Sequence, residues 1–330
     1  FGGFSLSAAQ YAPCGDGLQC GPISASPNKQ LNLTFDCAWV VPDSPKGFVY
    51  HMHGNDGVRP KGMFFALMIQ LAASGFSSLA CDGRGYSPDA SPNVMQAYNY
   101  NLLAGDISAI VRASGLSSAF NNRFHLVAHD QGARVAWHAI ALGPLRSQLL
   151  SFSTLSIPHA DVFSDSLIGP HADLRQQEAA QYVRMLVLPN STTAFDGAID
   201  KTVCRSYHKA TLPCQRALWW YNGAIDSGAM ALSPMKPFGS IAKAIGITPA
   251  QVESATQYPL DGVRQTVKVG LVSEFPVLFS CGAGDSSDLC SQKVADRSQL
   301  YITDFSFLFL SQCGHNVLWC ANQTQRQQLQ

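Results

Sequence analysis

The residues best suited to chemistry lie in one short stretch, FHLVAHDQGAR, at positions 124–134. An apolar run, Phe124 to Ala128, leads into a turn in which two small residues flank Asp130, and a helix-like segment, Ala133 to Leu142, follows. This order predicts a sharp strand-to-helix turn that lifts one side chain above a parallel sheet. A carboxylate attacks carbon centres well but is a poor acyl-transfer nucleophile. The turn therefore favours opening of an epoxide or displacement of a halide over hydrolysis of a carboxyl ester.

Two more residues complete a candidate catalytic set. His315 follows the apolar run Phe305 to Leu310, and Asp285 follows an apolar strand and a glycine-rich turn. Parallel strands present their carboxyl ends at one edge of a sheet, so Asp130, Asp285 and His315 are expected to meet there. Asp130 would form an alkyl ester, His315 would take a proton from the water that hydrolyses it, and Asp285 would orient the imidazole. Taken singly, each residue could also be an ordinary turn or helix-cap residue.

Hydrolysis of the ester also requires hydrogen-bond donors for the oxyanion. The candidates are the backbone N–H groups of Asn55, which follows His53 and Gly54, and of Gln131, directly after Asp130. The sequence has no Gly-x-Ser-x-Gly motif, which removes the main competing nucleophile. The chemistry needs no cofactor and no metal.

The elements that must position these residues alternate between strand and helix. Strands are expected at 31–41, 47–51, 77–81, 124–128, 150–156, 275–281 and 305–310, and helices at 63–74, 97–113 and 133–142. This alternation predicts an α/β fold with a mostly parallel central sheet and helices on both faces. After Pro158 the pattern becomes helical, which indicates an inserted cap. The predicted division is an N-terminal arm at 1–30, a core at 31–158 and 271–330, and a helical cap at 159–270.

Composition limits the choice of partners. The chain has 330 residues, 46% of them hydrophobic and 13% charged, which suits one domain with a large insertion. The 22 basic and 22 acidic residues balance, so no nucleic-acid partner is indicated. No apolar run is long enough to span a bilayer. The oligomeric state is left open.

The cysteines and sequons favour a secreted protein. Ten cysteines include four locally spaced pairs, and no C-x-x-C pair is present to start a zinc site. The pairs are Cys14/Cys20, Cys204/Cys214, Cys281/Cys290 and Cys313/Cys320, with Cys37 and Cys81 left over. Asn32, Asn190 and Asn322 begin glycosylation sequons. The first residues resemble a mature end after signal removal, so we expect a disulfide-bonded glycoprotein in the secretory pathway or outside the cell.

Several motifs together resemble those of α/β-hydrolase-fold epoxide hydrolases and of the related haloalkane and haloacetate dehalogenases. Residues 53–56, His-Gly-Asn-Asp, resemble the family's His-Gly-x-Pro oxyanion loop. Residues 82–87 resemble its Asp-x-Arg-Gly-Tyr-Gly turn, and residues 156–159 the Ser-x-Pro-His segment that opens the lid. The order nucleophile, acid, histidine is also that of this fold. The similarity covers about residues 31–320 and implies a disulfide between Cys37 and Cys81, whose strands would be neighbours.

The resemblance also assigns roles in the cap. Tyr221, in a segment like the family's Leu-Asn-Trp-Tyr-Arg, and Tyr182 would donate hydrogen bonds to the epoxide oxygen, with Tyr207 in reserve. The same tyrosines could instead be core packing. A small apolar substrate would contact a further set of side chains, namely His53, Arg134, His159, Trp219 and Trp220.

Two departures from the family pattern keep other functions open. Asp56 stands where the oxyanion loop has proline, and Gln131 stands where a tryptophan follows the nucleophile. Asn55 and Arg134 each match one part of the dehalogenase sites, so carbon–halogen hydrolysis is the first alternative. A non-catalytic binding protein on the same scaffold is the second, because fold does not fix function. We expect an epoxide hydrolase that forms a vicinal diol through an ester on Asp130.

Overall fold

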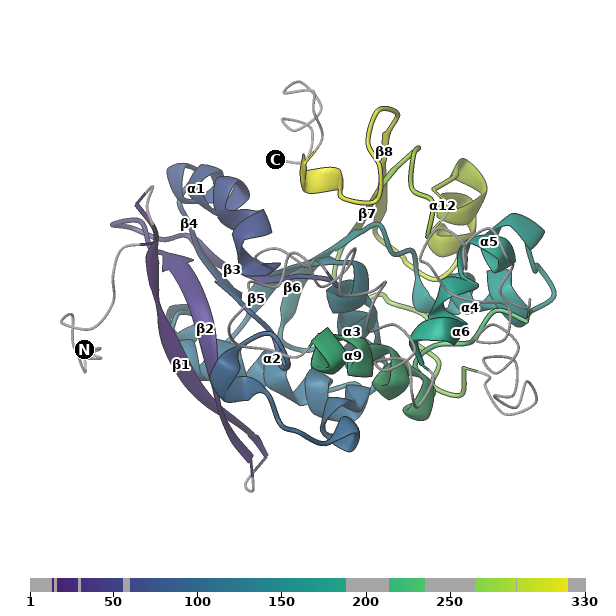
Figure 1. Ribbon diagram of the computed structural model, residues 1–330. Coiled ribbons are helices and arrows are strands. Elements are labelled where there is room, and N and C mark those ends of the chain that lie inside the picture. The colour runs from purple at the N-terminus through teal and green to yellow at the C-terminus, as the bar shows by residue number, and fades with distance from the viewer. Residues whose placement is uncertain are drawn as a thin grey trace.

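A central sheet of eight strands organises the computed structural model of the protein (Figure 1), which describes residues 14, 17–28, 31–55, 60–187, 214–234, 265–288 and 290–319. The strand order is β1-β2-β4-β3-β5-β6-β7-β8. The strands are β1 (Gln19–Asn28), β2 (Leu31–Val40), β3 (Gly47–Met52), β4 (Phe76–Cys81), β5 (Phe124–His129), β6 (Leu149–Leu155), β7 (Val277–Gly282) and β8 (Phe305–Leu310). β1 and β2 run antiparallel to their neighbours and the other pairs are parallel, so the predicted fold class is confirmed.

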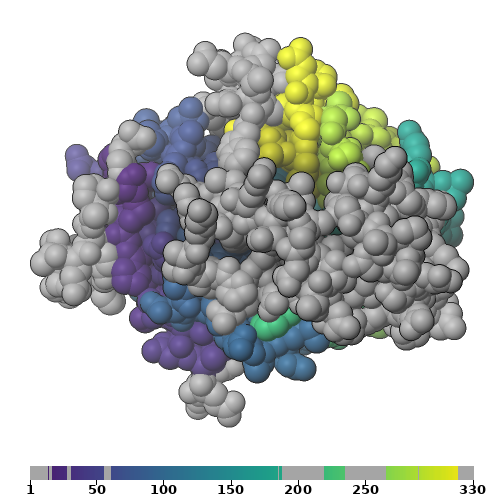
Figure 2. All heavy atoms as spheres, in the orientation of Figure 1, coloured from purple at the N-terminus to yellow at the C-terminus, as the bar shows by residue number. Residues whose placement is uncertain are grey.

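Helices cover both faces of this sheet (Figure 1). The α-helices are α1 (Phe65–Ala73), α2 (Tyr100–Ser114), α3 (Asp130–Ala141), α4 (Ala160–Ile168), α5 (Leu174–Ala179), α6 (Tyr182–Leu186), α9 (Cys214–Asp226) and α12 (Gln292–Gln299). Short 3-10 helices are η1 (Pro60–Phe64), η2 (Pro88–Ala90), η3 (Met95–Tyr98), η4 (Ser118–Phe120) and η6 (Val317–Trp319). In Figure 2, β1 lies at the left of the face in view and β8 at its upper right, so the sheet extends across the molecule.

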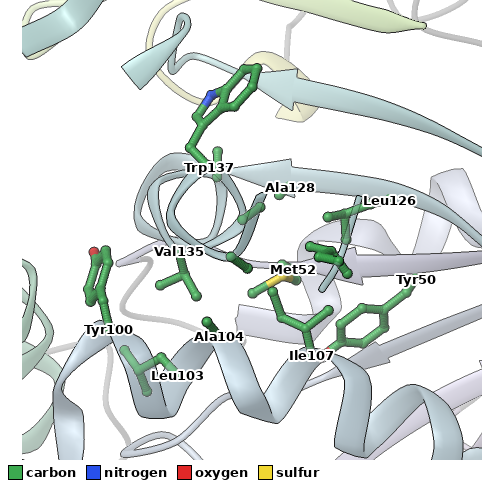
Figure 3. Close-up of a cluster of buried hydrophobic side chains, with 14 of the residues drawn as sticks. Tyr50, Met52, Tyr100, Leu103, Ala104, Ile107, Leu126, Ala128, Val135 and Trp137 are labelled. Atoms are coloured by element: carbon green, nitrogen blue, oxygen red, sulfur yellow. The ribbon is translucent and has the colours of Figure 1, made fainter. Parts of the chain in front are cut away.

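The core on the α2 and α3 face holds β5, the strand that leads into Asp130. Figure 3 shows side chains of these two helices meeting those of β3 and β5. The labelled residues are Tyr50, Met52, Tyr100, Leu103, Ala104, Ile107, Leu126, Ala128, Val135 and Trp137. On the opposite face, Met68 of α1 and the buried Phe64 pack on Ala38, Ala80 and Leu155. Burial on both faces explains why the sequence of β3 does not alternate between apolar and exposed polar residues.

The N-terminal arm predicted for residues 1–30 is wrong for residues 19–28, which form β1. Gly21, Ile23 and Ala25 face inward and alternate with exposed residues, as in a half-buried strand. Pro22 and Pro27 are tolerated because β1 is an edge strand. The strand was not predicted because glycine and alanine occupy inward positions and two prolines interrupt the apolar pattern.

Between β6 and β7, the described part of the chain contains helices α4, α5, α6 and α9, as expected of an inserted cap. Trp220 of α9 fastens this insertion to the core, since its indole N–H donates to the carbonyl of Arg84 at 2.7 Å. The bounds of the cap at 159–270 stay a prediction. Tyr207 and Asp56 lie outside the described residues.

Three disulfides are present among the described residues: Cys14–Cys20, Cys37–Cys81 and Cys281–Cys290. The second follows from the sheet, because Cys37 of β2 lies directly opposite Cys81 of β4. Cys313 is also disulfide-bonded, while Cys204 and Cys320 lie outside the described residues, as does the side chain of Cys214. Among the sequons, Asn32 is exposed, and Asn190 and Asn322 lie outside the described residues. No helix in the described ranges is long and apolar enough to cross a membrane.

Candidate active site

The predicted strand-to-helix turn is present between β5 and α3, with Asp130 as the first residue of the helix. Asp130 has φ of 47°, in the left-handed region that side-chain-bearing residues rarely adopt. Two glycines let the turn fit against β3. A Cβ atom on Gly132 would lie 2.3 Å from the carbonyl oxygen of His53, and one on Gly54 would lie 2.4 Å from the Cβ of Asp130. This packing aims the Asp130 carboxyl at the end of the sheet.

Replacing Gly132 with alanine is expected to lower the free energy of unfolding by about 1–3 kcal/mol, because the added methyl overlaps backbone that cannot move freely. Activity should fall as well, since the displaced backbone carries Asp130. Urea unfolding and turnover measure both effects. Gly105→Ala in α2 is the matched control, since its Cβ would meet Pro27 at 3.6 Å, an ordinary contact. Equal behaviour of the two variants would contradict the prediction.

Asp130, His315 and Asp285 lie together at the carboxyl ends of their strands. His315 Nε2 is 3.5 Å from Asp130 Oδ1, and His315 Nδ1 donates to Asp285 Oδ2 at 2.8 Å. Asp285 is itself fixed, because the backbone N–H groups of Ser287 and Asp288 donate to its other oxygen at 3.0 and 2.9 Å. Residues from three distant parts of the chain thus come together as their order predicts, and their role as a catalytic relay stays a prediction.

The backbone of His315 is held by two residues that the sequence analysis missed. The Ser156 hydroxyl and the Nε2–H of His129 both donate to the carbonyl oxygen of His315. Ser156 directly follows β6 and has φ of 68°, a second strained position at this edge of the sheet. These bonds fix the imidazole relative to β5 and β6. Their signal in the sequence is the position of His129 and Ser156 at the ends of predicted strands.

The buried charges of the relay stabilise one another. Burial raises the pKa of Asp130, but the hydrogen bond and charge of His315, the nearby His129 and the Asn55 N–H lower it by more, so its pKa lies well below the ordinary value. Burial lowers the pKa of His315, yet Asp130, Asp285 and Asp288 raise it to about 11. Burial also raises the pKa of Asp285, but the hydrogen bond and charge of His315 lower this pKa by more. In the free protein Asp130 is therefore a carboxylate and His315 an imidazolium.

This pairing makes stability depend on pH. The raised pKa of His315 contributes stability that is fully present below its ordinary 6.5 and is lost as the pH rises towards 11. The lowered pKa of Asp130 contributes stability that is present above its ordinary 3.8 and is lost as the pH falls. The difference in unfolding free energy between wild type and His315→Gln should therefore peak between these two ordinary values. Urea unfolding over a pH series checks this, and a flat difference would contradict it.

The loop after β3 carries Asn55, the first candidate oxyanion donor. The backbone N–H of Asn55 donates to Asp130 Oδ2 at 2.8 Å. His53 braces this loop, since its Nε2 accepts from the N–H of Gly83 and its Nδ1–H donates to the carbonyl of Gly54, each at 2.7 Å. Both ring nitrogens of His53 thus serve the backbone, and a substrate contact by His53 stays a prediction. Gln131 is fully buried and accepts a hydrogen bond from the Tyr100 hydroxyl, while its N–H as the second donor stays a prediction.

Both cap tyrosines lie beside Asp130, the candidate nucleophile. The rings of Tyr182 and Tyr221 pack edge to face, with centroids 6.2 Å apart. The Asn55 side chain links them to the core, since its Nδ2 donates to the Tyr221 hydroxyl at 3.5 Å and its Oδ1 accepts from Tyr86 at 2.7 Å. Burial and the charge of Asp130 raise the pKa of Tyr221 to about 12, and burial also raises that of Tyr182. Both hydroxyls are therefore protonated at neutral pH and able to donate.

The two tryptophans of α9 pack against the core. Trp220 lies nearly parallel to His53, with centroids 6.0 Å apart, and meets Tyr86 edge to face. Trp219 meets Tyr98 of η3 edge to face at 5.3 Å. These contacts position α9, and hence Tyr221, above the turn. Contacts of Trp219 and Trp220 with a substrate stay predictions.

The structure places His159 differently from the other predicted site residues. His159 is the N-cap of α4, where its Nδ1 accepts from the Asp161 N–H and its Nε2–H donates to the carbonyl of Gly270. Its ring stacks on Tyr301 and tilts against Trp137. Burial lowers its pKa to about 4, so it is neutral. A substrate contact by His159 stays a prediction without support in this geometry.

A third carboxylate, Asp288, lies beside the relay and was missed from the sequence. It is buried, forms an ion pair with Arg134 of α3, and its Oδ2 is 3.9 Å from His315 Nδ1. Among the described residues, Asp130, Asp288 and His315 each place one potential metal-ligand atom within 4.8 Å of the others. Within this set, Asp288 is already paired with Arg134, and His315 is already paired with Asp285. The Asp-x-x-Asp spacing of Asp285 and Asp288 is the signal that could have identified the residue.

Comparison with known proteins supports the resemblance drawn from the motifs, although no protein-family model matches the chain. Over 76 residues the sequence is 37% identical to epoxide hydrolase B of Mycobacterium tuberculosis, a match that covers 23% of this chain and 20% of that protein. Over 117 residues it is 26% identical to epoxide hydrolase 3 of Xenopus tropicalis, covering 36% and 29%. The matches thus span less than a third of the length of these relatives.

The fold extends the likeness over nearly the whole chain. A point mutant of an epoxide hydrolase from Bacillus megaterium, solved with its naphthyloxy-propanediol product, superposes with a TM-score of 0.61 and 16% identity. The superposition covers 94% of this chain and 96% of the other. The predicted resemblance to α/β-hydrolase-fold epoxide hydrolases is confirmed, by local sequence similarity and by a shared fold.

Proposed function

We propose, from this likeness to α/β-hydrolase-fold epoxide hydrolases, that the protein converts a small, largely apolar epoxide into a vicinal diol through an ester on Asp130. The observation that carries the proposal is a single constellation. A buried, ionised carboxylate lies at the apex of a strained turn, with His315 on one side and two protonated tyrosines beside it. The aromatic product held by the Bacillus megaterium relative suggests an aromatic epoxide.

In the first half of the reaction, Asp130 would attack an epoxide carbon. The N–H of Asn55 holds Oδ2, which leaves Oδ1 as the attacking oxygen. Opening of the ring produces an alkoxide, which is too basic to form unaided in a buried site. Tyr182 and Tyr221 would donate to this oxygen as the carbon–oxygen bond breaks.

The charges of the site fit the transfer of one proton. Before the attack, Asp130 is an anion and His315 a cation. Ester formation neutralises Asp130 and so removes a main cause of the raised pKa of His315. The imidazolium can then return a proton to the tyrosine that protonated the alkoxide. His315 becomes neutral at the step where a base is needed.

In the second half, neutral His315 would take a proton from water, and the oxygen of that water would attack the ester carbonyl. The negative charge then develops on Oδ2, where the Asn55 N–H already lies and the Gln131 N–H would add a second donor. Collapse of this intermediate breaks the bond to the leaving alkoxide, which takes the proton of the added hydroxyl group, so the diol is freed, Asp130 is again a carboxylate and His315 is left as the imidazolium. Asp285 would stabilise the imidazolium that results.

Product analysis tests the proposal against its alternatives. Purified protein should convert styrene oxide to its diol and should release little halide from haloalkanes or chloroacetate. Two observations favour epoxide chemistry. The Asn55 side-chain amide is hydrogen-bonded to Tyr221 and Tyr86, so it is not set to bind a halide. Arg134 is paired with Asp288, so it is not set to bind a substrate carboxylate. Release of halide without formation of diol would instead support a dehalogenase. Neither product, with no covalent adduct, would leave a binding protein.

The described disulfides and the exposed sequon at Asn32 support a site of action in the secretory pathway or outside the cell. Intact mass before and after treatment with a glycosidase tests glycosylation in a eukaryotic host.

A further inference from the structure

The ion pair between Asp288 and Arg134 lies at the edge of the candidate active site. Arg134 follows Asp130 by four residues on α3, so both side chains emerge from the same side of the helix. Asp288 lies in the loop that also carries Asp285, and its carboxylate reaches within 4.8 Å of Asp130 and His315. The pair therefore belongs to the wall around the nucleophile.

The bonding of this pair is incomplete on both sides. Both side chains are buried, at 8% and 2% exposure. Arg134 donates one guanidinium N–H to Asp288 Oδ1, and the guanidinium lies over the ring of Phe163 at 4.1 Å. Arg134 Nε and Asp288 Oδ2 have no hydrogen-bond partner among the described residues. A guanidinium that retains a free donor beside the nucleophile can accept another planar anion if its present partner is removed.

The net charge around Asp130 determines whether the site can accept a carboxylate, and the Asp288–Arg134 pair contributes to that charge. Asp130, Asp285 and Asp288 face His315 and Arg134, three anions against two cations. A bound carboxylate would add a fourth anion to this buried group. Without Asp288 the same site would hold two anions and two cations, with the fork of Arg134 exposed to the substrate.

We propose that Asp288 sets the charge of the accepted substrate: by pairing with Arg134 it closes this guanidinium to carboxylates and keeps the site selective for neutral ligands. The proposal rests on the proposed function only in naming the site as the place of catalysis. Asp288 is thus a specificity-determining residue, and its removal should create an anion site at Arg134.

Binding of benzoate, with benzamide as its neutral match, tests this in wild type and in Asp288→Asn. Benzoate should bind Asp288→Asn about tenfold to a hundredfold more tightly than wild type, as a charge-assisted bidentate pair allows. Benzamide should bind both equally. In Arg134→Met/Asp288→Asn the gain should vanish. Calorimetry and benzoate-dependent thermal stabilisation give the affinities without any turnover.

Asp106→Asn is the matched control, because it breaks a second buried pair, in which Arg84 donates to both oxygens of Asp106 of α2. This variant should show no gain in benzoate binding. An equal affinity of folded Asp288→Asn and wild type for benzoate would overturn the proposal, as would an equal gain in Asp106→Asn.

Wild type gives a second measurement in case Asp288→Asn does not fold. Burial raises the pKa of Asp288 to about 6, against the opposing effect of Arg134 and His315 and with the help of Asp285 and Asp130. Protonation should release Arg134, so benzoate should bind wild type more tightly as the pH falls from about 7.5 to 5, where benzoate is still mostly ionised. A benzoate affinity that does not rise over this range would contradict the proposal.

The two proposals fail in different ways. If epoxides label Asp130 but no variant gains benzoate affinity, the enzymatic function stands and the role of Asp288 falls. If Asp288→Asn gains benzoate affinity but no epoxide reacts with wild type, the role of Asp288 stands and the function falls.

Discussion

Replacing Asp130 with asparagine is expected to abolish turnover of epoxides, with kcat at least about 10⁴-fold lower, since the reaction loses its nucleophile. The carboxamide has no negative charge with which to attack carbon. It also removes the partner that keeps His315 protonated. Diol formation from styrene oxide measures the loss, and Asp89→Asn, at an exposed position, is the control for a change of the same chemistry elsewhere.

Replacing His315 with glutamine should instead stop the reaction halfway. Attack by Asp130 does not need a base, so the ester should form and then persist because no imidazole activates water. Intact mass spectrometry should show one adduct per chain, on a peptide that contains Asp130, and none in Asp130→Asn/His315→Gln. Absence of an adduct from His315→Gln with every epoxide and alkyl halide tried would falsify the covalent mechanism.

The outline of the fold could be predicted because local patterns in the sequence determine it. The apolar runs at Phe124 and Phe305 begin β5 and β8, and the run at Gly47 begins β3, within a residue of their predicted bounds. β3 and β5 are largely buried inside the sheet, so burial imposes an apolar pattern on them. β8 is an edge strand and only its last residue, Leu310, is fully buried. β1 escaped prediction because it is an edge strand, where glycine, alanine and proline suffice to meet one neighbour.

The candidate site could be predicted only in part, for a physical reason. Asp130, Asp285 and His315 follow strands, and parallel strands bring their carboxyl ends together. Asp288 and Arg134 are 154 residues apart and meet through a loop conformation that no local pattern specifies. The carbonyl of His315 is held in the same way, by His129 and Ser156 across the sheet. His53 and His159 were recognised from motifs, yet their backbone partners depend on how the loops pack.

The second large effect on turnover is expected when the cap tyrosines are replaced. Tyr221→Phe and Tyr182→Phe are each expected to lower kcat for an epoxide by about 10²–10³-fold, as removal of one oxyanion donor does elsewhere. The double variant should be close to inactive, because the alkoxide then has no proton donor. Tyr98→Phe is the matched control, since it removes a buried hydroxyl that donates to the carbonyl of Pro92 and keeps the ring that contacts Trp219.

The step that slows identifies the role of these hydroxyls. In a His315→Gln background, Tyr221→Phe should slow formation of the adduct by the same factor, because the tyrosine acts while the epoxide ring opens. An alkyl halide needs no proton donor for its leaving group, so any labelling of Asp130 by a halide should change much less. Equal slowing with both reagents would indicate that Tyr221 only packs the cap. Selective slowing with the epoxide assigns the hydroxyl to the leaving oxygen, which separates this chemistry from carbon–halogen hydrolysis by the same nucleophile.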